Sequence, residues 1–473
     1  MDLLPSQVRD FRDNHSSNIA FWVGLGFFVL YAMAAMMGQK QITMMIALGI
    51  LACITVVCLR MPLLCSAAWV LLIGSTPEMW LPDIIHNSSN MATALTKLSG
   101  FGLVGICVLR YGLVIDLFNP GFAFVLMFFF GLGHGLYPTL TIGESLRTVV
   151  GSAAPYAFSF SRLSRRWSAA IIEATIWVPT LCLVFGALLD AARIRPLLSA
   201  DVGGSVRLAG STHPAFLATL AMTSCYACLI ELYRNGRSRY MWLFALNFAI
   251  LVGTGSRSPL ACEIMVTGIA FVAIRSESFT LRRRVLPFLV GLFALPVVLV
   301  LLASSSDSLR LLTILSDKQA GSLSGRGLIW PFFERAWNAS PMFGWGVGTG
   351  KILVDPHSAV AKLLGTTAAH NEYLRIGVEG GYVGIGLVMV FMVLWTWRWT
   401  TGMIRTDKVI ARLIMIGFAV ESITDNTLIA TPSSVLFIWL SAIFARGRIE
   451  ALQGRRQGDP GAEATPDDFR AAA

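Results

Sequence analysis

Hydrophobic residues follow one another along this chain in long, nearly uninterrupted runs that short polar stretches separate. Each run approaches the roughly 20 residues that an α-helix needs to cross the hydrocarbon core of a bilayer. A soluble core does not require so many runs of this length, so the pattern predicts membrane-spanning helices. The predicted spans are residues 21–37, 41–59, 62–80, 97–109, 119–137, 168–190, 214–233, 240–254, 259–274, 285–304, 376–397, 412–428 and 431–445.

A weaker apolar stretch at residues 149–160 decides how often the chain is expected to cross the membrane. Basic residues near both ends of the chain indicate one common side, whereas the clear spans alone would put these ends on opposite sides. Counting the weaker stretch as a short crossing restores the agreement, and a re-entrant or interfacial segment is the alternative. We therefore expect an all-α fold, a polytopic transmembrane helical bundle of about 12–14 spans with one large periplasmic loop.

Composition supports a membrane protein, and the distribution of charge gives the predicted helices an orientation. Of 473 residues, 55% are hydrophobic and 14% are charged, whereas soluble domains carry about a quarter charged residues. The net charge of +10 does not indicate a nucleic-acid partner, because the basic residues form short clusters between apolar runs, as the positive-inside rule describes. The clusters assigned to the cytoplasm are 162–166, 234–239, 275–284 and 398–412. Alternation then places residues 191–213, 255–258 and 305–371 outside.

The same pattern divides the chain into five segments. The polar N-terminus is expected to be a cytoplasmic lead-in, since no small-residue cleavage site of a signal peptide follows the first apolar run. The C-terminal tail combines low hydrophobicity with many small and turn-forming residues, which predicts disorder. The segments are a cytoplasmic N-terminus at 1–19, a transmembrane bundle at 20–304, the large periplasmic loop at 305–371, C-terminal transmembrane helices at 372–446 and the tail at 447–473.

Three predicted outer segments each carry an arginine that is a candidate functional residue. Arg207 lies in the first outer loop, Arg257 in a tight turn between two apolar runs, and Arg326 in the large loop. A short outer turn has no topological need for an arginine, so these residues are candidates for ligand binding; snorkelling to outer-leaflet headgroups is the alternative. The guanidinium fork binds phosphate oxygens in pairs and keeps its charge when desolvated, which predicts a lipid-linked polyanion such as a pyrophosphate.

A histidine at the end of the large loop is the candidate general base. His370 precedes the apolar run 376–397, so we expect it in the first turn of a helix. The positive end of the helix dipole disfavours protonated imidazole there, and neutral imidazole accepts a proton near neutral pH. A structural histidine is the alternative. Glycines at three- and four-residue spacings then predict close packing against a neighbouring helix: Gly377, Gly380, Gly381 and Gly384.

The large loop is rich in aromatic residues that suit the binding of sugar rings. Stacking on sugars, an interfacial aromatic belt and a small loop core are all consistent with their pattern. The glycine-rich run 344–351 lacks the spacing of a nucleotide-binding loop, and we expect a flexible turn there. The aromatic residues are Trp330, Phe332, Phe333, Trp337, Phe343 and Trp345.

Two motifs in the large loop and the helix after it resemble a known family. His370 and Asn371, followed after nine residues by Gly381 and after two more by Gly384, resemble the H[NSQ]-x9-G-x-x-G signature of O-antigen ligases and related polysaccharide polymerases. The segment 324–330, which reads SGRGLIW, resembles the start of that family's large periplasmic loop.

Two earlier motifs extend the resemblance over roughly residues 200–390. The turn TGSR at 254–257 is similar to the TGSRG turn of the family, with Ser258 in place of the usual glycine. The segment RLAG at 207–210 is similar to an earlier loop motif, although HPA at 213–215 replaces the Pro-Asn often found downstream.

The resemblance implies a metal-independent glycosyltransferase that uses an undecaprenyl-pyrophosphate-linked oligosaccharide at the periplasmic face of the bacterial inner membrane. His370 would deprotonate the acceptor hydroxyl, while Arg257 and Arg326 would hold the departing pyrophosphate. No cofactor is expected; the lipid bilayer and other polysaccharide assembly proteins are the expected partners, and nucleic acid is not. The expected substrate-binding residues are Arg207, Trp330, Asn371, Tyr373 and Glu379.

Within the family we favour a polymerase of exopolysaccharide or O-antigen repeats. A polymerase must accommodate a second lipid-linked pyrophosphate at the acceptor, and the predicted outer face offers more cations than one pyrophosphate requires. The alternatives are a ligase that moves the glycan to lipid A core and, less favoured, a transporter, for which the predicted spans hold few ionisable residues. The additional outer cations are Arg207, Arg310, Arg335, Lys351 and Lys362.

Overall fold

The structure of the protein, a computed structural model, describes residues 69–84, 104–105, 107–109, 111–200, 206–274, 326–364 and 366–458. The side chains of Ala200, Arg326 and residues 454–458 lie outside this description. Predictions for the following segments also concern residues that are not described: the ends of the chain at 1–19 and 459–473, the spans 21–37, 41–59 and 285–304, and the loop start at 305–325 with Arg310.

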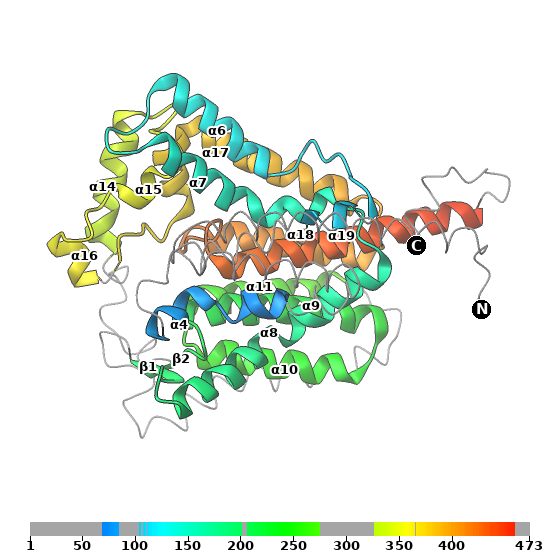
Figure 1. Cartoon of the computed structure of the whole chain (residues 1–473). Coiled ribbons are helices and arrows are strands. Elements are labelled where there is room, and N and C mark those ends of the chain that lie inside the picture. The colour runs from blue at the N-terminus through cyan, green and yellow to red at the C-terminus, as the bar shows by residue number, and fades with distance from the viewer. Residues whose placement is uncertain are drawn as a thin grey trace, which may run out of the picture.

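The described residues fold almost entirely into helices, and the longer helices run side by side between the two ends of the molecule (Figure 1). These are α8 (Arg165–Ala191), α9 (Pro214–Asn235), α10 (Ser238–Gly253), α11 (Arg257–Ala273), α17 (Glu372–Thr400), α18 (Arg405–Glu421) and α19 (Thr431–Gly458). Short elements gather at one end, which we call the loop end. They are α4 (Pro77–Ile84), β1 (Leu198–Ala200), β2 (Val206–Leu208), α14 (Arg326–Ala339), α15 (Thr349–Ile352) and α16 (Ala359–Leu364).

Helix α9 lies at the centre of this arrangement, packed against α8, α10, α11 and α19. In its most apolar 18-residue window, 89% of the residues are buried. A helix that is covered on all sides needs apolar residues all round, and its few hydroxyls must find partners within the helix. Thr223 and Ser224 do so by donating to the carbonyls of Thr219 and Leu220, one turn earlier.

A second layer covers part of this core. Helix α6 (Gly121–His134) packs on α17, and α7 (Ile142–Ala153) leads into the 3₁₀ helix η1 (Ala154–Phe160), which packs on α19. A capping box at Thr141 and Glu144 starts α7, because each residue satisfies a backbone amide of the other. The predicted crossing at 149–160 is therefore the end of α7 followed by η1, instead of one straight helix.

Among the described residues, three helices are long and apolar enough to cross a membrane by their length and composition: α8, α9 and α17. They coincide with the predicted spans 168–190, 214–233 and 376–397, and the shorter apolar helices α6 and α10 coincide with 119–137 and 240–254. The predicted predominance of helix is thus confirmed in the described residues, while the total number of crossings remains a prediction.

Four local features differ from the sequence-based expectation. Helix α18 ends at Glu421, so the predicted span 412–428 is displaced towards the C-terminus and includes a turn. The predicted span 62–80 is interrupted at Thr76, which has a φ of 47°, before α4 begins. Helix α11 already begins at Arg257. Strands β1 and β2 form a two-stranded antiparallel sheet in a chain predicted to be all-α.

Helix α17 is broken at Gly381, whose φ of 61° and ψ of −159° lie outside the helical region. The amide groups just after the break therefore lack acceptors in their own helix. The amide of Tyr382 donates to the carbonyl of Pro341 at 2.8 Å, and the amide of Val383 donates to Met342 at 3.1 Å. Because a broken helix in an apolar surrounding needs partners for its freed backbone groups, the loop supplies what the helix has lost.

The same loop segment also satisfies the backbone before the break. The carbonyl of Val378 accepts from the amide of Trp345 at 2.8 Å, and the carbonyl of Glu379 accepts from Gly346 at 3.0 Å. Residues 341–346 are thus paired with α17 on both sides of the break, and they hold the large loop to this helix.

Glycines allow this close approach, as their spacing predicted. A Cβ atom on Gly377 would lie 2.6 Å from the ring of Trp337 in α14. Gly380 and Gly384 face Met127 of α6, where an added Cβ would come within 2.6 Å and 3.1 Å of its methyl group. The prediction that these glycines pack tightly against neighbouring elements is confirmed.

The glycine-rich run 344–351 is not the flexible turn that its composition suggested. Val347 is fully buried, and its carbonyl accepts a hydrogen bond from the hydroxyl of Ser145 in α7 at 2.7 Å. The carbonyl of Trp345 accepts from the amide of Tyr137 at 3.0 Å. The glycines let this backbone run between α6, α7 and α17, which holds it in place.

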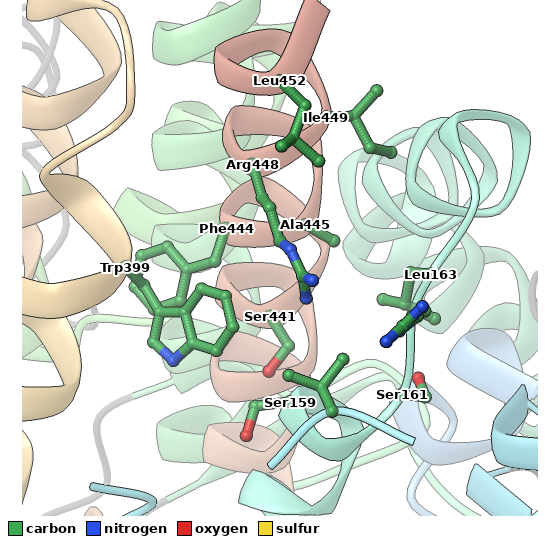
Figure 2. A pocket seen from close by; sticks show the side chains of 12 residues that line it. Ser159, Ser161, Leu163, Trp399, Ser441, Phe444, Ala445, Arg448, Ile449 and Leu452 are labelled. Atoms are coloured by element: carbon green, nitrogen blue, oxygen red, sulfur yellow. The ribbon is translucent and has the colours of Figure 1, made fainter. Parts of the chain in front are cut away.

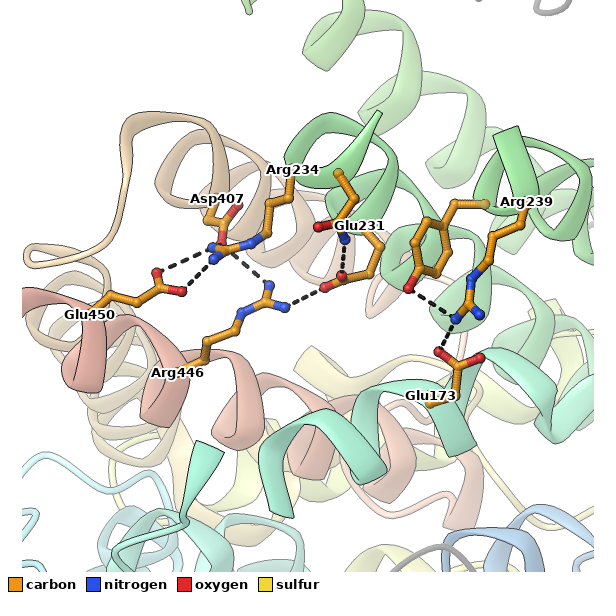
Figure 3. A network of polar contacts seen from close by, with 9 residues as sticks. Glu173, Glu231, Arg234, Arg239, Asp407, Arg446 and Glu450 are labelled. Atoms are coloured by element: carbon orange, nitrogen blue, oxygen red, sulfur yellow. Dashed lines mark hydrogen bonds and ion pairs between the residues drawn. The ribbon is translucent and has the colours of Figure 1, made fainter. Parts of the chain in front are cut away.

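An ionic network closes the end of the molecule opposite the loop end (Figure 3). Arg234 pairs with Asp407 at 2.5 Å and with Glu450. Arg446 pairs with Glu231 and lies 3.4 Å from Asp407. The network joins the end of α9, the start of α18 and the second half of α19, which are three segments predicted to lie on the cytoplasmic side.

The break in α17 predicts a sharp difference between two glycines of one helix. Gly381→Ala should lower the thermal stability of the purified protein strongly, since this backbone region is essentially confined to glycine and costs other residues about 1–3 kcal/mol, and since the added Cβ would lie 2.3 Å from the Met342 carbonyl. Gly386→Ala is the control, because nothing lies within 4 Å of an added Cβ there. Equal melting temperatures for both variants would contradict a required break at Gly381.

Candidate functional site

His370 lies at the loop end, immediately before α17 and not in its first turn as expected, because Asn371 is the N-cap of this helix. The His370 side chain is held between two polar groups. Its Nδ1 lies 3.3 Å from Oδ1 of Asp425, and its Nε2 lies 3.4 Å from the hydroxyl of Thr366. The side chain is 35% exposed. Its φ of 48° is uncommon outside glycine, and such strained residues concentrate at functional sites. His370 is therefore accessible, oriented and close to a carboxylate.

Asp425 is a site residue that the sequence did not reveal. It lies in the turn between α18 and α19, residues 422–430, and not inside a span as the apolar run 412–428 suggested. Glu421, Asp425 and Asn426 stand close together in that run. Two acidic residues so near each other are costly within a membrane span, so their spacing was the signal for a turn.

The first turn of α17 is bonded directly to the 422–430 turn. The amide of Glu372 donates to the carbonyl of Ser422 at 2.9 Å, and the amide of Leu428 donates to the Glu372 carboxylate at 2.8 Å. Arg375, buried beside it, donates to Glu372 at 2.6 Å and to Glu379 at 2.6 Å. These bonds set the distance between His370 and Asp425, since they fix the two backbones that carry them.

Arg207 holds the turn that precedes α11. Its Nε donates to the carbonyl of Thr254 at 2.8 Å, and its Nη2 donates to the hydroxyl of Ser256 at 2.8 Å. On the other side of the turn, the hydroxyl of Thr424 donates to Ser258 at 2.6 Å. The 254–258 turn is therefore tied both to the first outer loop and to the turn that carries Asp425.

Arg257 begins α11 with an exposed side chain. No described residue forms a hydrogen bond or an ion pair with its guanidinium group. The positive end of the α11 dipole adds to its charge, so an anion here would meet two favourable fields. Arg326 begins α14, but its side chain lies outside the described residues, so its proposed contact with the same ligand stays a prediction.

His213 lies close enough to charged groups of several of these segments for their charges to shift its pKa. Desolvation by the surrounding loop end lowers the pKa of His213, and the charges of Arg207 and Arg195 lower it further. Asp425 and His370 also act on it, Asp425 in the opposite direction. Its Nδ1 accepts from the amide of Ala215 at 3.3 Å and caps α9. The first outer loop, the 422–430 turn and the end of the large loop therefore meet here.

The aromatic residues of the large loop form a small core of their own. Phe333 is fully buried with Ile329 and Val354, and Trp330, Trp337 and Trp345 pack against this cluster. The indole Nε1 of Trp330 donates to the carbonyl of Ala369 at 2.8 Å, directly before His370. Of the three interpretations of the aromatic pattern, the structure supports the loop core for these residues.

The other predicted substrate-binding residues have local partners. Asn371 caps α17 by accepting from the amide of Leu374 at 3.1 Å. Tyr373 donates its hydroxyl hydrogen to the carbonyl of Ala419 in α18 at 2.9 Å. Glu379 is fully buried against Arg375 and is not brought to the His370 side chain. Their predicted contacts with a substrate remain untested.

Among the described residues, no group of three or more histidine, cysteine, aspartate or glutamate side chains is placed to hold a metal ion. The positive groups of this region are arginines: Arg207 and Arg195 act on His213, and Arg257 extends from the turn that Arg207 holds. The arrangement can take up a proton and bind an anion within one region of the loop end.

Comparison with known proteins identifies the part of the chain that builds most of this site. The family model described as O-antigen ligase matches residues 242–389, which run from α10 to the first half of α17 and include Arg257 and His370. No curated protein matches the chain. Residues 242–389 are therefore similar to the O-antigen ligase family, as the motifs predicted, and this match supports a membrane glycan-processing enzyme of the ligase and polymerase type.

Proposed function

We propose that this protein joins glycans at a membrane surface, with a lipid-pyrophosphate-linked oligosaccharide as donor and a hydroxyl of a second glycan as acceptor. The observation that carries the proposal is the meeting of His370, Asp425 and the arginine-bearing turn 254–258, which come from separate parts of the chain. A base beside an anion site suits a reaction in which a hydroxyl loses a proton and a pyrophosphate departs.

In the proposed reaction, the acceptor oxygen attacks the anomeric carbon of the donor sugar, and the bond from that carbon to the pyrophosphate oxygen breaks. His370 Nε2 takes the hydroxyl proton, and the lipid pyrophosphate leaves with the electron pair of the broken bond. Asp425 lies 3.3 Å from Nδ1; it is proposed to accept from Nδ1–H, which leaves Nε2 unprotonated and able to take the proton, and to stabilise the imidazolium ion that forms.

Arg257 is proposed to bind the pyrophosphate as its negative charge develops. The guanidinium fork pairs with two phosphate oxygens, and the side chain is exposed at the start of α11. Arg207 is proposed to act mainly by positioning, because its guanidinium group is bonded to the turn that carries Arg257. Arg326 remains the proposed second contact to the pyrophosphate. With guanidinium groups supplying the positive charge, the reaction is proposed to need no metal ion.

We propose that the protein lies in the bacterial inner membrane with its loop end towards the periplasm. The arginines of the opposite end, Arg234 and Arg446 among them, support this orientation because basic residues are retained on the cytoplasmic side. The donor would then be an undecaprenyl-pyrophosphate-linked oligosaccharide that has already reached the outer leaflet.

Within the family we propose a polymerase, which extends one lipid-linked repeat unit with another. Cations exposed on the loop helices support the proposal, since a lipid-linked acceptor brings a second pyrophosphate: Arg335 on α14, Lys351 on α15 and Lys362 on α16. The alternative within the same family is a ligase that moves the glycan to lipid A core.

Removal of the proposed base should nearly abolish the reaction. His370→Ala is expected to lower the initial rate of glycan transfer by about 10²–10⁴-fold, the usual contribution of general acid–base catalysis. Asp425→Asn should cause a smaller loss, since it keeps the shape but not the charge that orients the imidazole. The rates are measured with purified protein and a lipid-linked oligosaccharide.

His357→Ala is the matched control for this experiment, because His357 is an exposed histidine of the same loop. It should retain the rate of the unmodified protein. A His370→Ala protein that is correctly inserted and equally active would rule out the base.

Trp330→Phe separates a positioning role from a sugar-stacking role. Phenylalanine keeps an aromatic face but loses the Nε1–H that the Ala369 carbonyl accepts. A net loss of about 1 kcal/mol predicts a roughly fivefold lower kcat with little change in KM. Trp397→Phe, on an exposed part of α17, serves as the control. If Trp330→Phe leaves kcat unchanged, Trp330 does not position His370.

A deletion strain distinguishes the two family activities. Loss of a polymerase should leave single lipid-linked repeat units and no long polymer, because the units are made but not joined. Analysis of extracted lipid-linked glycans by size provides the measurement. Long lipid-linked polymer that fails to reach its final acceptor would instead establish the ligase alternative.

A further inference from the structure

His213 lies at the loop end, and no step of the proposed reaction involves its side chain. The backbone before it is fixed, since the amide of Ser211 donates to the carbonyl of Cys182 in α8 at 3.0 Å. Gly210, with a φ of 63°, passes so close to α8 that a Cβ atom on Gly186 would lie 2.3 Å from its carbonyl carbon. His213 therefore begins α9 from a segment that is packed firmly on a neighbouring helix.

The imidazole of His213 has one nitrogen engaged and one available. Its Nδ1 accepts from the amide of Ala215 at 3.3 Å, and the ring lies beside that of Phe216, with the ring centroids 6.1 Å apart. A nitrogen that accepts carries no proton, so in neutral imidazole the proton is on Nε2. No described residue forms a hydrogen bond with Nε2, and the side chain is exposed. The Nε2–H group is therefore an oriented donor that a ligand can reach.

The charges around His213 keep its ring neutral and favour an anion beside it. Partial desolvation lowers the pKa of His213, and the charges of Arg207 and Arg195 lower this pKa further. Both arginines are held in place, Arg207 by the 254–258 turn and Arg195 by Asp83 at 3.3 Å. Near neutral pH the ring thus keeps one proton, while an anion at Nε2–H would meet the field of two fixed cations.

His213 also lies near the groups that are proposed to carry out the reaction. The helix that it caps, α9, is joined to the end of α18 by the hydroxyl of Thr219, which lies 3.4 Å from the Glu421 carboxylate. Glu421 precedes Asp425 by four residues, and the charges of Asp425 and His370 both act on the pKa of His213. One region of the loop end therefore holds His370 as the proposed base and His213 as a hydrogen-bond donor.

Two arginines at the opposite end of the molecule line a pocket that is too small for a phosphate group (Figure 2). They are Arg162 and Arg448, and the pocket lies between α19 and the segment before α8. The space that it encloses is about 30 Å³, which is room for about two water molecules. At the loop end, by contrast, the donor of His213 lies on an exposed side chain.

We propose that His213 binds the donor substrate, with its Nε2–H group donating a hydrogen bond to an oxygen of the lipid pyrophosphate. This contact rests on the proposed function, since it involves the pyrophosphate of the same donor. A sugar hydroxyl is uncharged and would gain little from Arg207 and Arg195, whereas a phosphate oxygen accepts hydrogen bonds and carries the opposite charge. The hydrogen bond strengthens as negative charge develops on the departing oxygen, and His213 keeps its proton throughout.

The test measures pyrophosphate binding without the transfer reaction. Geranylgeranyl pyrophosphate, a short polyprenyl pyrophosphate without a sugar, is titrated into the purified full-length protein in detergent, and its dissociation constant is measured by calorimetry. His213→Ser should weaken binding by about tenfold, as expected for the loss of a hydrogen bond to a charged group. Because serine also caps helices, the melting temperature of this variant should stay unchanged.

Two controls isolate the contact. His357→Ser is the matched variant, because His357 is an exposed histidine of the large loop, and it should bind the pyrophosphate as the unmodified protein does. Geranylgeraniol, which lacks the pyrophosphate, should bind the unmodified and His213→Ser proteins equally. If His213→Ser does not fold, His213→Thr takes its place, since threonine also caps helices.

The outcomes separate this contact from the proposed function. Tenfold weaker binding of geranylgeranyl pyrophosphate by His213→Ser, with both controls unchanged, supports the proposal. Equal binding of the pyrophosphate by all three proteins overturns it and leaves the proposed function standing, and so does an equal loss of geranylgeraniol binding in His213→Ser. If the unmodified protein does not bind geranylgeranyl pyrophosphate, both the His213 contact and the pyrophosphate site of the proposed function are wrong.

Discussion

Helix α17 cannot complete its own backbone hydrogen bonds around Gly381, and residues 341–346 complete them. In an apolar surrounding an unpaired backbone group costs several kcal/mol, so the broken helix and the loop segment stabilise each other. This pairing attaches the large loop to the helix that begins just after His370. The helices α14 and α16 then add a small hydrophobic core above the same helix. The large loop is thereby joined to α17 by backbone hydrogen bonds and by side-chain packing.

His370 lies where two such attachments meet. Trp330 holds the backbone before it through the Ala369 carbonyl, and the Ser422 carbonyl holds the backbone after it by accepting from the Glu372 amide. These contacts impose a left-handed backbone at His370, a strain of about 1–3 kcal/mol that persists only when surrounding bonds enforce it. With this backbone conformation, the imidazole of His370 lies beside the carboxylate of Asp425 in the neighbouring turn. The geometry of the site thus follows from the attachment of the loop.

The two ends of the molecule use arginine in different ways. At the loop end, Arg207 fastens a turn and leaves Arg257 exposed to an external anion. At the opposite end, Arg234 joins helices through carboxylates. Guanidinium groups serve both purposes because they stay charged and donate in several directions. An arginine is structural where groups of the protein use its donors, as they do for Arg207 and Arg234.

By itself, the sequence determined the helical character of the apolar runs, since a run of roughly 20 such residues has few alternatives, and its motifs identified the family and His370. Tertiary structure alone decided which residues surround that histidine. Asp425 stands 55 positions from its partner inside an apolar run, and Trp330 resembled a sugar-binding aromatic. Glu379 resembled a site acid, yet it is buried against Arg375. Residue type and spacing are local properties, whereas hydrogen-bond partners depend on which distant segments the packing of helices brings together.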